Sequence, residues 1–309
     1  MDSIIRIAQV IVPIFVSVFL GMLSRKKSLM TPEEVRGMQQ FVMKFGLPCV
    51  VFNACLTANV GAESLGTMLL ILPFILIATL WAFRARGRLF SYHNFPMLFA
   101  AQESGMLGIP LYMILFGAAQ AYRMGILDIT QAAIGFTTIA ILTTDTGEKP
   151  SPFYIAKKVL TSPLMVMSLL GLFLNLTGIG RWMDSIGIGG IVTQTTSFLS
   201  QPVSAMMIFS VGYNFSLAGG NRKAIFRVST VHFFVYAAIG LIVQLGLFLI
   251  PGVDAMTRWA VLMYSTLPPS YLAPGLGKTE EDFTVTSGVC SILTAVSLGI
   301  FCVIANIVA

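Results

Sequence analysis

Charged side chains are scarce in this sequence. Only 10% of its 309 residues are Asp, Glu, Lys or Arg, and 56% are hydrophobic, whereas an ordinary soluble domain is about 25% charged. This composition excludes a typical water-soluble protein and indicates a polytopic membrane protein. Since a spanning helix needs about 20 apolar residues, ten spans would use roughly two thirds of the chain, leaving only short loops and no room for a separate soluble domain.

Histidine and cysteine are also rare. The four cysteines fall in apolar segments without the spacing of metal ligands or redox pairs, so we interpret them as packing residues. The two histidines, His93 and His232, are predicted near cytoplasmic span ends and cannot form a metal site by themselves. The sequence contains no metalloprotease pattern, nucleophile elbow or nucleotide-binding loop. We therefore expect no enzyme activity, no metal and no cofactor.

Apolar runs bounded by charged and turn residues predict ten membrane spans. The stretch SIGIGG at 185–190 is expected to open the seventh as a loop or tilted start, and the first is expected to be retained rather than cleaved as a signal peptide. The predicted spans are 4–23, 36–58, 65–83, 94–117, 124–142, 158–178, 187–217, 228–250, 258–277 and 284–308.

The basic residues are distributed unevenly between the predicted loops. With ten spans, 14 of the 19 Lys and Arg residues lie on one side and four on the other, and Lys44 lies within a span. The positive-inside rule then places both termini outside the cytoplasm, in a multi-pass protein of the cytoplasmic (inner) membrane. The same rule accounts for the net charge of +6, so we predict a lipid bilayer and no nucleic acid as partner.

Proline and glycine landmarks recur along the chain in the same order. Three pairs of landmarks are separated by 150, 154 and 158 residues: Pro13 to Gly21 with Pro163 to Gly171, Pro48 with Pro202, and Pro110 with Pro268. A repeat with an odd number of spans must be inverted in the membrane. We therefore predict an all-α polytopic fold of two inverted five-helix repeats, at 1–150 and 151–309, an architecture of many secondary transporters.

The fourth and ninth predicted spans are the most interrupted. The fourth contains ESGMLGIPLYMILFG at 103–117, and the ninth contains STLPPSYLAPGLG at 265–277. Proline removes a helical N–H and glycine tolerates an unwound backbone, and freed polar groups must be buried in protein or line a wet cavity. If the two breaks cross, they form a midplane site for a polar solute or ion. The alternative is an ordinary proline kink in each helix.

These segments, with LPCVVF at 47–52, resemble the auxin efflux carrier family in its compact bacterial form. The resemblance implies the fold of bile acid/sodium symporters, with crossing fourth and ninth helices. It implies a scaffold of spans 1, 2, 6 and 7, and a transport domain of spans 3, 4, 5, 8, 9 and 10. The implied substrates are small organic anions, auxin in plant members and dicarboxylates in bacterial ones. Coupling to sodium, to protons or to neither stays open, as does a homodimer.

One residue departs from the family pattern. Members commonly have Asn seven residues before the fourth-span proline, where it can hydrogen-bond a substrate carboxylate, but this chain has Glu103. An ionised Glu103 would repel an anion, so it is protonated, or binds a cation, or the substrate is not a simple anion. The alternative is a structural hydrogen bond across the crossover. Lys44 either pairs with Glu103 or an anion, or extends to the cytoplasmic interface.

We predict that the remaining site residues flank the breaks. Asn53 and Asn214 are scaffold-side contacts or, equally, interhelical hydrogen-bonding residues, and Asp128 is interpreted as an interfacial or capping residue. The predicted substrate-binding residues are Glu103, Ser104, Gly105, Gly108, Pro110, Asn53, Thr266, Pro268, Pro269, Ser270 and Tyr271.

The leading functional hypothesis is a secondary carrier that moves a small organic solute, most simply a carboxylate, by alternating access. A carrier of a cationic or zwitterionic solute, with Glu103 as counter-charge or proton site, is the alternative. An intramembrane enzyme using Glu103 and Asp128, a channel and a membrane sensor are weaker candidates, because the sequence offers neither a catalytic motif nor a signalling domain.

Overall fold

The computed structural model describes residues 2–57, 62–143, 151, 153–154, 157, 160–215 and 221–308. Within these residues every regular element is a helix, and extended pairing is limited to two isolated bridges. The first half contains α1 (Asp2–Lys26), α2 (Pro32–Phe41), η1 (Val42–Gly46), α3 (Leu47–Thr57), α4 (Ala62–Ala85), α5 (Met97–Ala100), η2 (Ser104–Gly108), α6 (Ile109–Phe116), η3 (Ala118–Gln120) and α7 (Ala121–Thr143).

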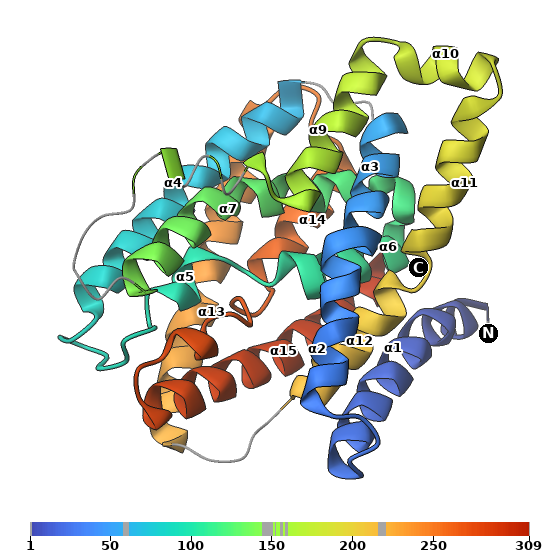
Figure 1. Cartoon of the computed structure of the whole chain (residues 1–309). Helices are drawn as coiled ribbons and strands as arrows, with labels where there is room; N and C mark the ends of the chain where they lie inside the picture. The colour runs from blue at the N-terminus through green and yellow to red at the C-terminus, as the bar shows by residue number, and fades with distance from the viewer. Residues whose placement is uncertain are drawn as a thin grey trace.

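The second half also consists of helices of very different length. It contains α9 (Pro163–Leu176), α10 (Ile179–Ser185), α11 (Ile188–Ser200), α12 (Val203–Asn214), α13 (Arg222–Gly246), η4 (Leu247–Leu249), α14 (Ala255–Ser265), η5 (Pro274–Leu276) and α15 (Glu280–Val308). Figure 1 shows α10, α11 and α1 along one side of the molecule, and α4, α5 and α13 along the other.

Helix occurs in each of the ten segments that the sequence marks as apolar spans. Five continuous stretches of the described residues are long and apolar enough to cross a membrane, at 32–57, 63–85, 118–143, 222–249 and 280–308. The α9–α10 pair, bent by 75°, is a candidate sixth. A turn in the SIGIGG stretch is confirmed: α10 ends at Ser185, α11 begins at Ile188, and Gly187 between them adopts a φ of 80° that favours glycine.

Two prolines are preceded by a π-helical turn. The π-helix η1 ends two residues before Pro48, and η2 ends two residues before Pro110. A proline has no N–H to donate, and its ring clashes with the carbonyl four residues earlier. The wider i to i+5 turn carries the chain past this defect, as in the bond from the Ile109 N–H to the Ser104 carbonyl.

Glycines allow two helix pairs to approach closely. In the α1–α12 pair, a Cβ on Gly21 would clash with the Phe209 carbonyl oxygen and lie 2.6 Å from the Tyr213 nitrogen. In the α3–α9 pair, a Cβ on Gly171 would lie 2.6 Å from the Phe52 carbonyl oxygen and 3.3 Å from the Leu56 nitrogen. Small residues at such crossings let membrane helices pack backbone against backbone.

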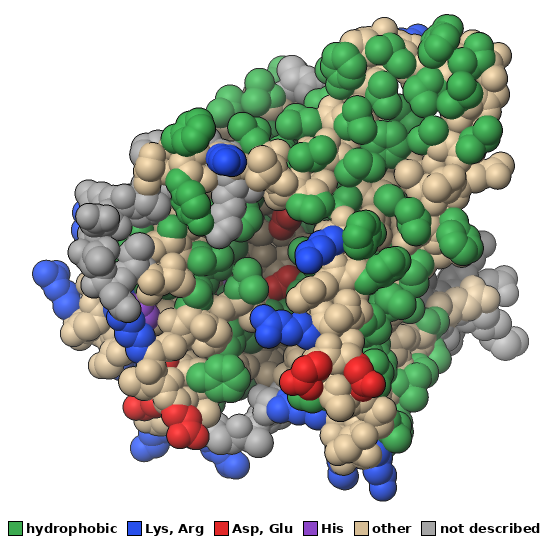
Figure 2. All heavy atoms as spheres, in the orientation of Figure 1, with side chains coloured by type: hydrophobic (Ala, Val, Ile, Leu, Met, Phe, Trp, Pro, Cys, Tyr) green, Lys and Arg blue, Asp and Glu red, His purple; other side chains and the backbone are tan. Residues whose placement is uncertain are grey.

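Large apolar side chains cover much of the outer surface. Figure 2 shows them over most of the upper part of the molecule. Phe19 on α1, Leu69 on α4, Phe226 on α13 and Val303 on α15 are each at least 60% exposed. A water-soluble monomer rarely exposes apolar patches of such extent, so this surface fits contact with lipid.

Candidate functional site

The two interrupted segments lie against each other. The chain leaves helical conformation at Ala101–Glu103 between α5 and η2, with Ala101 extended, and it does so again after α14. The Glu103 N–H donates to the Pro268 carbonyl at 2.8 Å, and the Ser270 N–H donates to the Ala101 carbonyl at 2.9 Å. Gln102 and Pro269 thereby form an isolated antiparallel bridge. The unwound backbones satisfy each other here, as burial away from water requires.

The interruption of the fourth segment does not lie where its glycines and proline predicted it. The extended residues precede Gly105 and Gly108, which belong to the π-helix η2, and Pro110 lies in the first turn of α6. Proline is tolerated there because the first N–H groups of a helix have no internal partner. In the ninth segment, by contrast, Pro268 and Pro269 lie in the unwound region itself.

Glu103 connects the two interruptions through both of its carboxylate oxygens. Its Oε2 accepts the Tyr271 N–H at 2.7 Å, and its Oε1 accepts the Met106 N–H at 3.3 Å. The side chain is 7% exposed and caps the N-terminus of η2. A carboxylate is favoured at such a position because the helix dipole presents positive partial charge there. Glu103 therefore makes the structural hydrogen bond across the two segments that was the alternative to a binding role.

Gln131 on α7 hydrogen-bonds several polar groups at the interruptions, and it is not among the site residues predicted from the sequence. Its side-chain oxygen accepts the Gln102 N–H at 2.7 Å and the Tyr264 hydroxyl at 2.6 Å. Its side-chain nitrogen donates to the Gln102 carbonyl and to the Ser104 hydroxyl, both at 2.8 Å. One glutamine thus satisfies polar groups of both interrupted segments. The signal in the sequence that could have identified Gln131 as a site residue is its position in an apolar span, at helical spacing from Asp128.

The interpretation of Asp128 as an interfacial or capping residue is wrong. Asp128 lies inside α7, where it accepts hydrogen bonds from the Ser104 hydroxyl and, at 3.1 Å, from the Gln131 side-chain nitrogen. It thereby becomes the second carboxylate beside the interruption of the fourth segment. A sequence cannot show this directly, because the contact joins residues of two different helices.

The position predicted for His232 is also wrong. It lies in the middle of α13, 1% exposed, with Nε2 3.2 Å from the Gln102 side chain. The satisfied orientation of the Gln102 amide donates to the Leu267 and Pro268 carbonyls and accepts from His232 and Tyr236. His93, in the segment before α5, does lie near a helix end, with Nε2 3.0 Å from the Leu142 carbonyl.

A cavity of about 480 Å³ opens beside the interruptions. Glu103, Asp128 and Gln131 line it together with Lys44 and Arg36. Figure 2 shows a hollow with acidic side chains inside and basic side chains around its mouth. Lys44 belongs to the π-helix η1, is exposed, and forms no ion pair with Glu103 or any other described carboxylate.

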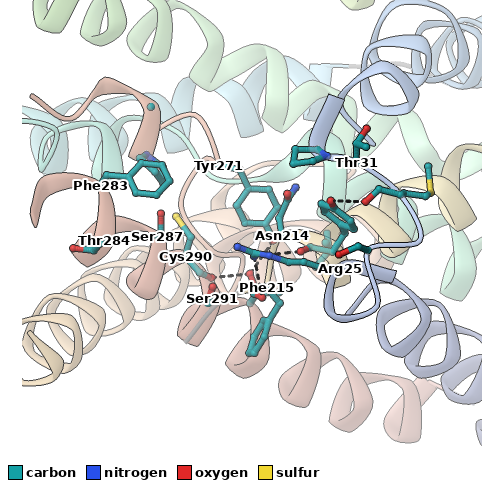
Figure 3. A pocket seen from close by; sticks show the side chains of 18 residues that line it. Arg25, Thr31, Asn214, Phe215, Tyr271, Phe283, Thr284, Ser287, Cys290 and Ser291 are labelled. Atoms are coloured by element: carbon teal, nitrogen blue, oxygen red, sulfur yellow. Dashed lines mark hydrogen bonds between the residues drawn. The ribbon is translucent and has the colours of Figure 1, made fainter. Parts of the chain in front are cut away.

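A second cavity, of about 730 Å³, lies between α1, α12 and α15 (Figure 3). Tyr271 and Asn214 line both cavities. The Tyr271 backbone contacts Glu103, and its hydroxyl lies 2.8 Å from the Thr294 hydroxyl on α15. Tyr271 therefore separates the two spaces at the point where the interrupted segments meet.

The other predicted site residues differ in whether they lie at the paired interruptions. Ser104, Gly105, Pro268, Pro269 and Ser270 lie at the paired interruptions or line a cavity there. The Thr266 hydroxyl donates to the Met263 carbonyl of its own helix end, at 2.9 Å.

Asn53 is not brought to the interruptions. It accepts the Thr196 hydroxyl at 2.6 Å and donates to the Ser197 hydroxyl at 3.3 Å, both on α11. The interhelical hydrogen-bonding alternative thus describes its contacts. Gly108 faces Leu267, to whose Cδ1 a Cβ would come within 2.7 Å, so its small size serves the packing of the two interrupted segments.

The described residues contain no group of three or more His, Cys, Asp or Glu side chains arranged to hold a metal.

A family model described as membrane transport protein matches residues 6–304. The chain belongs to this family. The match covers nearly the whole chain and confirms the resemblance to the auxin efflux carrier family. No curated protein matches the sequence. The paired interruptions and the two cavities are therefore features of a membrane transport protein.

Proposed function

We propose that this protein is a secondary carrier that moves a small organic solute, in the first place a carboxylate, by alternating access. The observation that carries the proposal is the backbone pairing of the two interrupted segments, with Glu103 and Tyr271 between two cavities. Irregular backbone at membrane depth is tolerated where it is buried in protein or lines a water-filled cavity, and the paired segments here are hydrogen-bonded to each other and lie beside two cavities.

The packing of α1 against α12 and of α3 against α9 supports the proposed inverted repeat of 1–150 and 151–309. Gly21 faces a carbonyl and the nitrogen four residues later, of Phe209 and Tyr213. Gly171, 150 residues after Gly21, faces the same pair of groups on Phe52 and Leu56. Equivalent glycines thus make equivalent contacts, as two copies of one five-helix unit would.

We further propose that the helices act as two groups. The scaffold comprises spans 1, 2, 6 and 7, which are α1, α2 with α3, α9, and α11 with α12. The transport domain comprises the rest and contains both interruptions and Gln131. Movement of one group against the other, as in an elevator, would expose the site to each side in turn.

The two carboxylates beside the interruptions favour a second candidate substrate. Glu103 and Asp128 both line the smaller cavity, and a cationic or zwitterionic solute would find its counter-charge there. The same pair is the natural place for a coupling sodium ion or proton. If Glu103 couples transport to an ion, Glu103→Gln abolishes the ion or pH dependence of uptake. Unchanged dependence in that variant would remove Glu103 from coupling.

Counterflow in proteoliposomes tests the carrier proposal. Vesicles preloaded with an unlabelled solute are diluted into the labelled solute, with small carboxylates, amino acids and amines each tested in turn. A carrier accumulates label transiently because exchange through one site is faster than net flux. A channel would dissipate the gradient without such an overshoot. Absence of counterflow for every solute would contradict the proposal, and the class that responds decides between the two candidate substrates.

A further inference from the structure

The two cavities beside the interruptions differ in charge. Two carboxylates, the buried Glu103 and the half-buried Asp128, line the smaller one, together with the cations Lys44 and Arg36. Arg25 is the only charged side chain among the described residues that line the larger one. An anion in the smaller cavity would pass Lys44 and Arg36 but also meet two carboxylates, whereas in the larger cavity it would meet a cation and no acid.

Arg25 is held in a position to serve an anion. Its Nη1 donates to the Tyr213 and Phe215 carbonyls, at 3.4 and 3.5 Å, which fixes the guanidinium at the C-terminal end of α12. The group carries five N–H donors, so several remain beyond these two bonds. Arg25 forms no ion pair in the described part of the chain. Figure 3 shows its side chain extending into the cavity toward α15.

Hydroxyl groups form the wall opposite Arg25. Thr284, Ser287, Ser291 and Thr294 of α15 follow one another at intervals of three and four residues and all line the cavity. This spacing places them on one face of the helix. The row leads to the Tyr271 hydroxyl, 2.8 Å from the Thr294 hydroxyl. The Thr284 and Thr294 hydroxyls donate to the Glu280 and Cys290 carbonyls of their own helix. Because hydroxyl hydrogens rotate to suit a partner, such a row can turn its donors toward an anion in the cavity.

We propose that the larger cavity binds the anionic group of the transported solute, with Arg25 as its cation and the hydroxyl row of α15 as its neutral donors. This assignment rests on the proposed carrier function. It also removes the conflict between a carboxylate substrate and Glu103, because the carboxylate binds on the side of Tyr271 away from the acids. The smaller cavity is left for the cationic part of a solute or for a coupling cation.

A measurement independent of the solute tests the charge of the larger cavity. Ser287→Cys places a thiol in this cavity, and Met106→Cys places one in the smaller cavity. Each variant reacts with an anionic sulfonatoethyl and a cationic trimethylammonioethyl methanethiosulfonate. For each reagent, the reaction rate of the parent chain is subtracted from that of the cysteine variant. The ratio of the anionic to the cationic reagent's rate is then divided by the same ratio for a free thiol. Across a water-filled cavity, one full charge changes this ratio by about fivefold.

We expect the anionic reagent to be favoured about fivefold or more at residue 287, and this preference to disappear in Arg25→Gln. Arg25→Lys should keep it. Lys26→Gln is the matched control, because Lys26 is the neighbouring exposed cation on α1 and lines neither cavity. The ratio at residue 106 should not depend on Arg25. No anionic preference at residue 287 in the chain that retains Arg25 overturns the proposal, even if Arg25→Gln fails to fold.

Counterflow of a carboxylate such as succinate or benzoate then tests whether the charge of Arg25 affects transport. Arg25→Gln should raise the KM for a transported carboxylate about tenfold, and Arg25→Lys and Lys26→Gln much less. An unchanged KM in Arg25→Gln would overturn the assignment while leaving the carrier function standing. Anionic preference at residue 287 without counterflow of any solute would instead contradict the carrier function and leave the cavity's preference for anions established.

Discussion

Glu103 holds the two interrupted segments together by accepting one backbone N–H from each, those of Met106 and Tyr271. In Glu103→Gln one carboxylate oxygen becomes an NH₂ group, which cannot accept a hydrogen bond. One buried donor is left without a partner, at a cost of about 1–3 kcal/mol. We therefore expect a lower free energy of unfolding and a lower melting temperature in detergent.

Glu280→Gln is the control for this substitution, since Glu280 is an exposed glutamate in the first turn of α15. It should melt within a degree or so of the parent, because exposed substitutions usually have small effects. Equal melting temperatures of Glu103→Gln and Glu280→Gln would show that Glu103 is not a structural link between the segments.

Asp254, at the start of α14, forms an ion pair with Arg123 at 2.5 Å. Burial raises the pKa of Asp254, but hydrogen bonds from Thr257 and Arg123 and the Arg123 charge outweigh it, so the pKa lies below its ordinary value. A depressed carboxyl pKa stabilises the folded protein above the unfolded-state pKa, and this contribution is lost as pH falls through the folded-state pKa.

Asp254→Asn keeps a good N-cap residue and removes only the charge. We expect it to lower the melting temperature at pH 7 by about 1–2 °C, because a partly exposed pair contributes little. The difference between parent and variant should begin to shrink as the pH falls below about 4, the ordinary Asp pKa, and vanish once the pH is below the lowered folded-state pKa of Asp254. A difference that persists or grows in acid would contradict this account.

Residues differ in how far their roles can be predicted from sequence. Glu103 was predictable, because an acid in an apolar segment is costly and therefore notable. Gln131 and His232 were not, because their roles arise from hydrogen bonds to Gln102, which lies in the non-helical segment between α5 and η2, far from either residue in sequence. A neutral polar residue inside a span has many possible partners, and sequence alone does not select one.

At the scale of helices, the close pairs α1–α12 and α3–α9 should be sensitive to a single methyl group. A Cβ on Gly21 or Gly171 would overlap backbone atoms of the partner helix, which cannot move aside as a side chain does. We expect Gly21→Ala and Gly171→Ala each to cost about 1–3 kcal/mol of stability, measured as a fall in melting temperature.

Gly37→Ala provides the control, because a Cβ on this glycine of α2 would meet no atom within 4 Å. Alanine favours helix over glycine by up to about 1 kcal/mol, so this variant should be as stable as the parent or more so. If Gly21→Ala or Gly171→Ala matched Gly37→Ala, the close helix crossings would be disproved.

The helical segments themselves follow from the apolar pattern, and helix occurs in every segment that this pattern marked. The exact place of the break in the fourth segment does not. Gly105, Gly108 and Pro110 suggested that it lay among them, yet the chain accommodates them in a π-turn and a helix start. The break lies at Ala101–Glu103, where pairing with Pro268 and Ser270 stabilises extended backbone. That pairing is a tertiary contact, which local sequence does not encode.

For the whole molecule, the distribution of Lys and Arg predicts both termini outside the cytoplasm. A fusion of alkaline phosphatase to residue 309 should therefore be active in a bacterial host. A fusion of green fluorescent protein to the same residue should be dark, because it would be exported through the membrane. Fusions within the 84–93 connection should give the reverse pattern. A fluorescent C-terminal fusion with an inactive phosphatase fusion would contradict the predicted orientation.

The proposed inverted repeat rests on prolines and glycines that recur in the same order, because these residues have strong effects on the backbone. The equivalent close contacts of Gly21 and Gly171 support this proposal. The proposed grouping into scaffold and transport domain comes from the family resemblance alone, since no local pattern tells which helices move together.

A reversible cross-link between the two helix groups tests the proposed motion. Val51 on α3 and Gly125 on α7 belong to the two proposed groups, and a Cβ on Gly125 would lie 3.4 Å from Val51 Cγ1. Cysteines at both positions are close enough for a disulfide, and neither position is among the residues that line the cavities. Counterflow is measured before oxidation, after it, and after reduction, with each single-cysteine variant as control. The account predicts that oxidation abolishes counterflow only in the double variant and that reduction restores it. Undiminished counterflow in the fully cross-linked protein would contradict it.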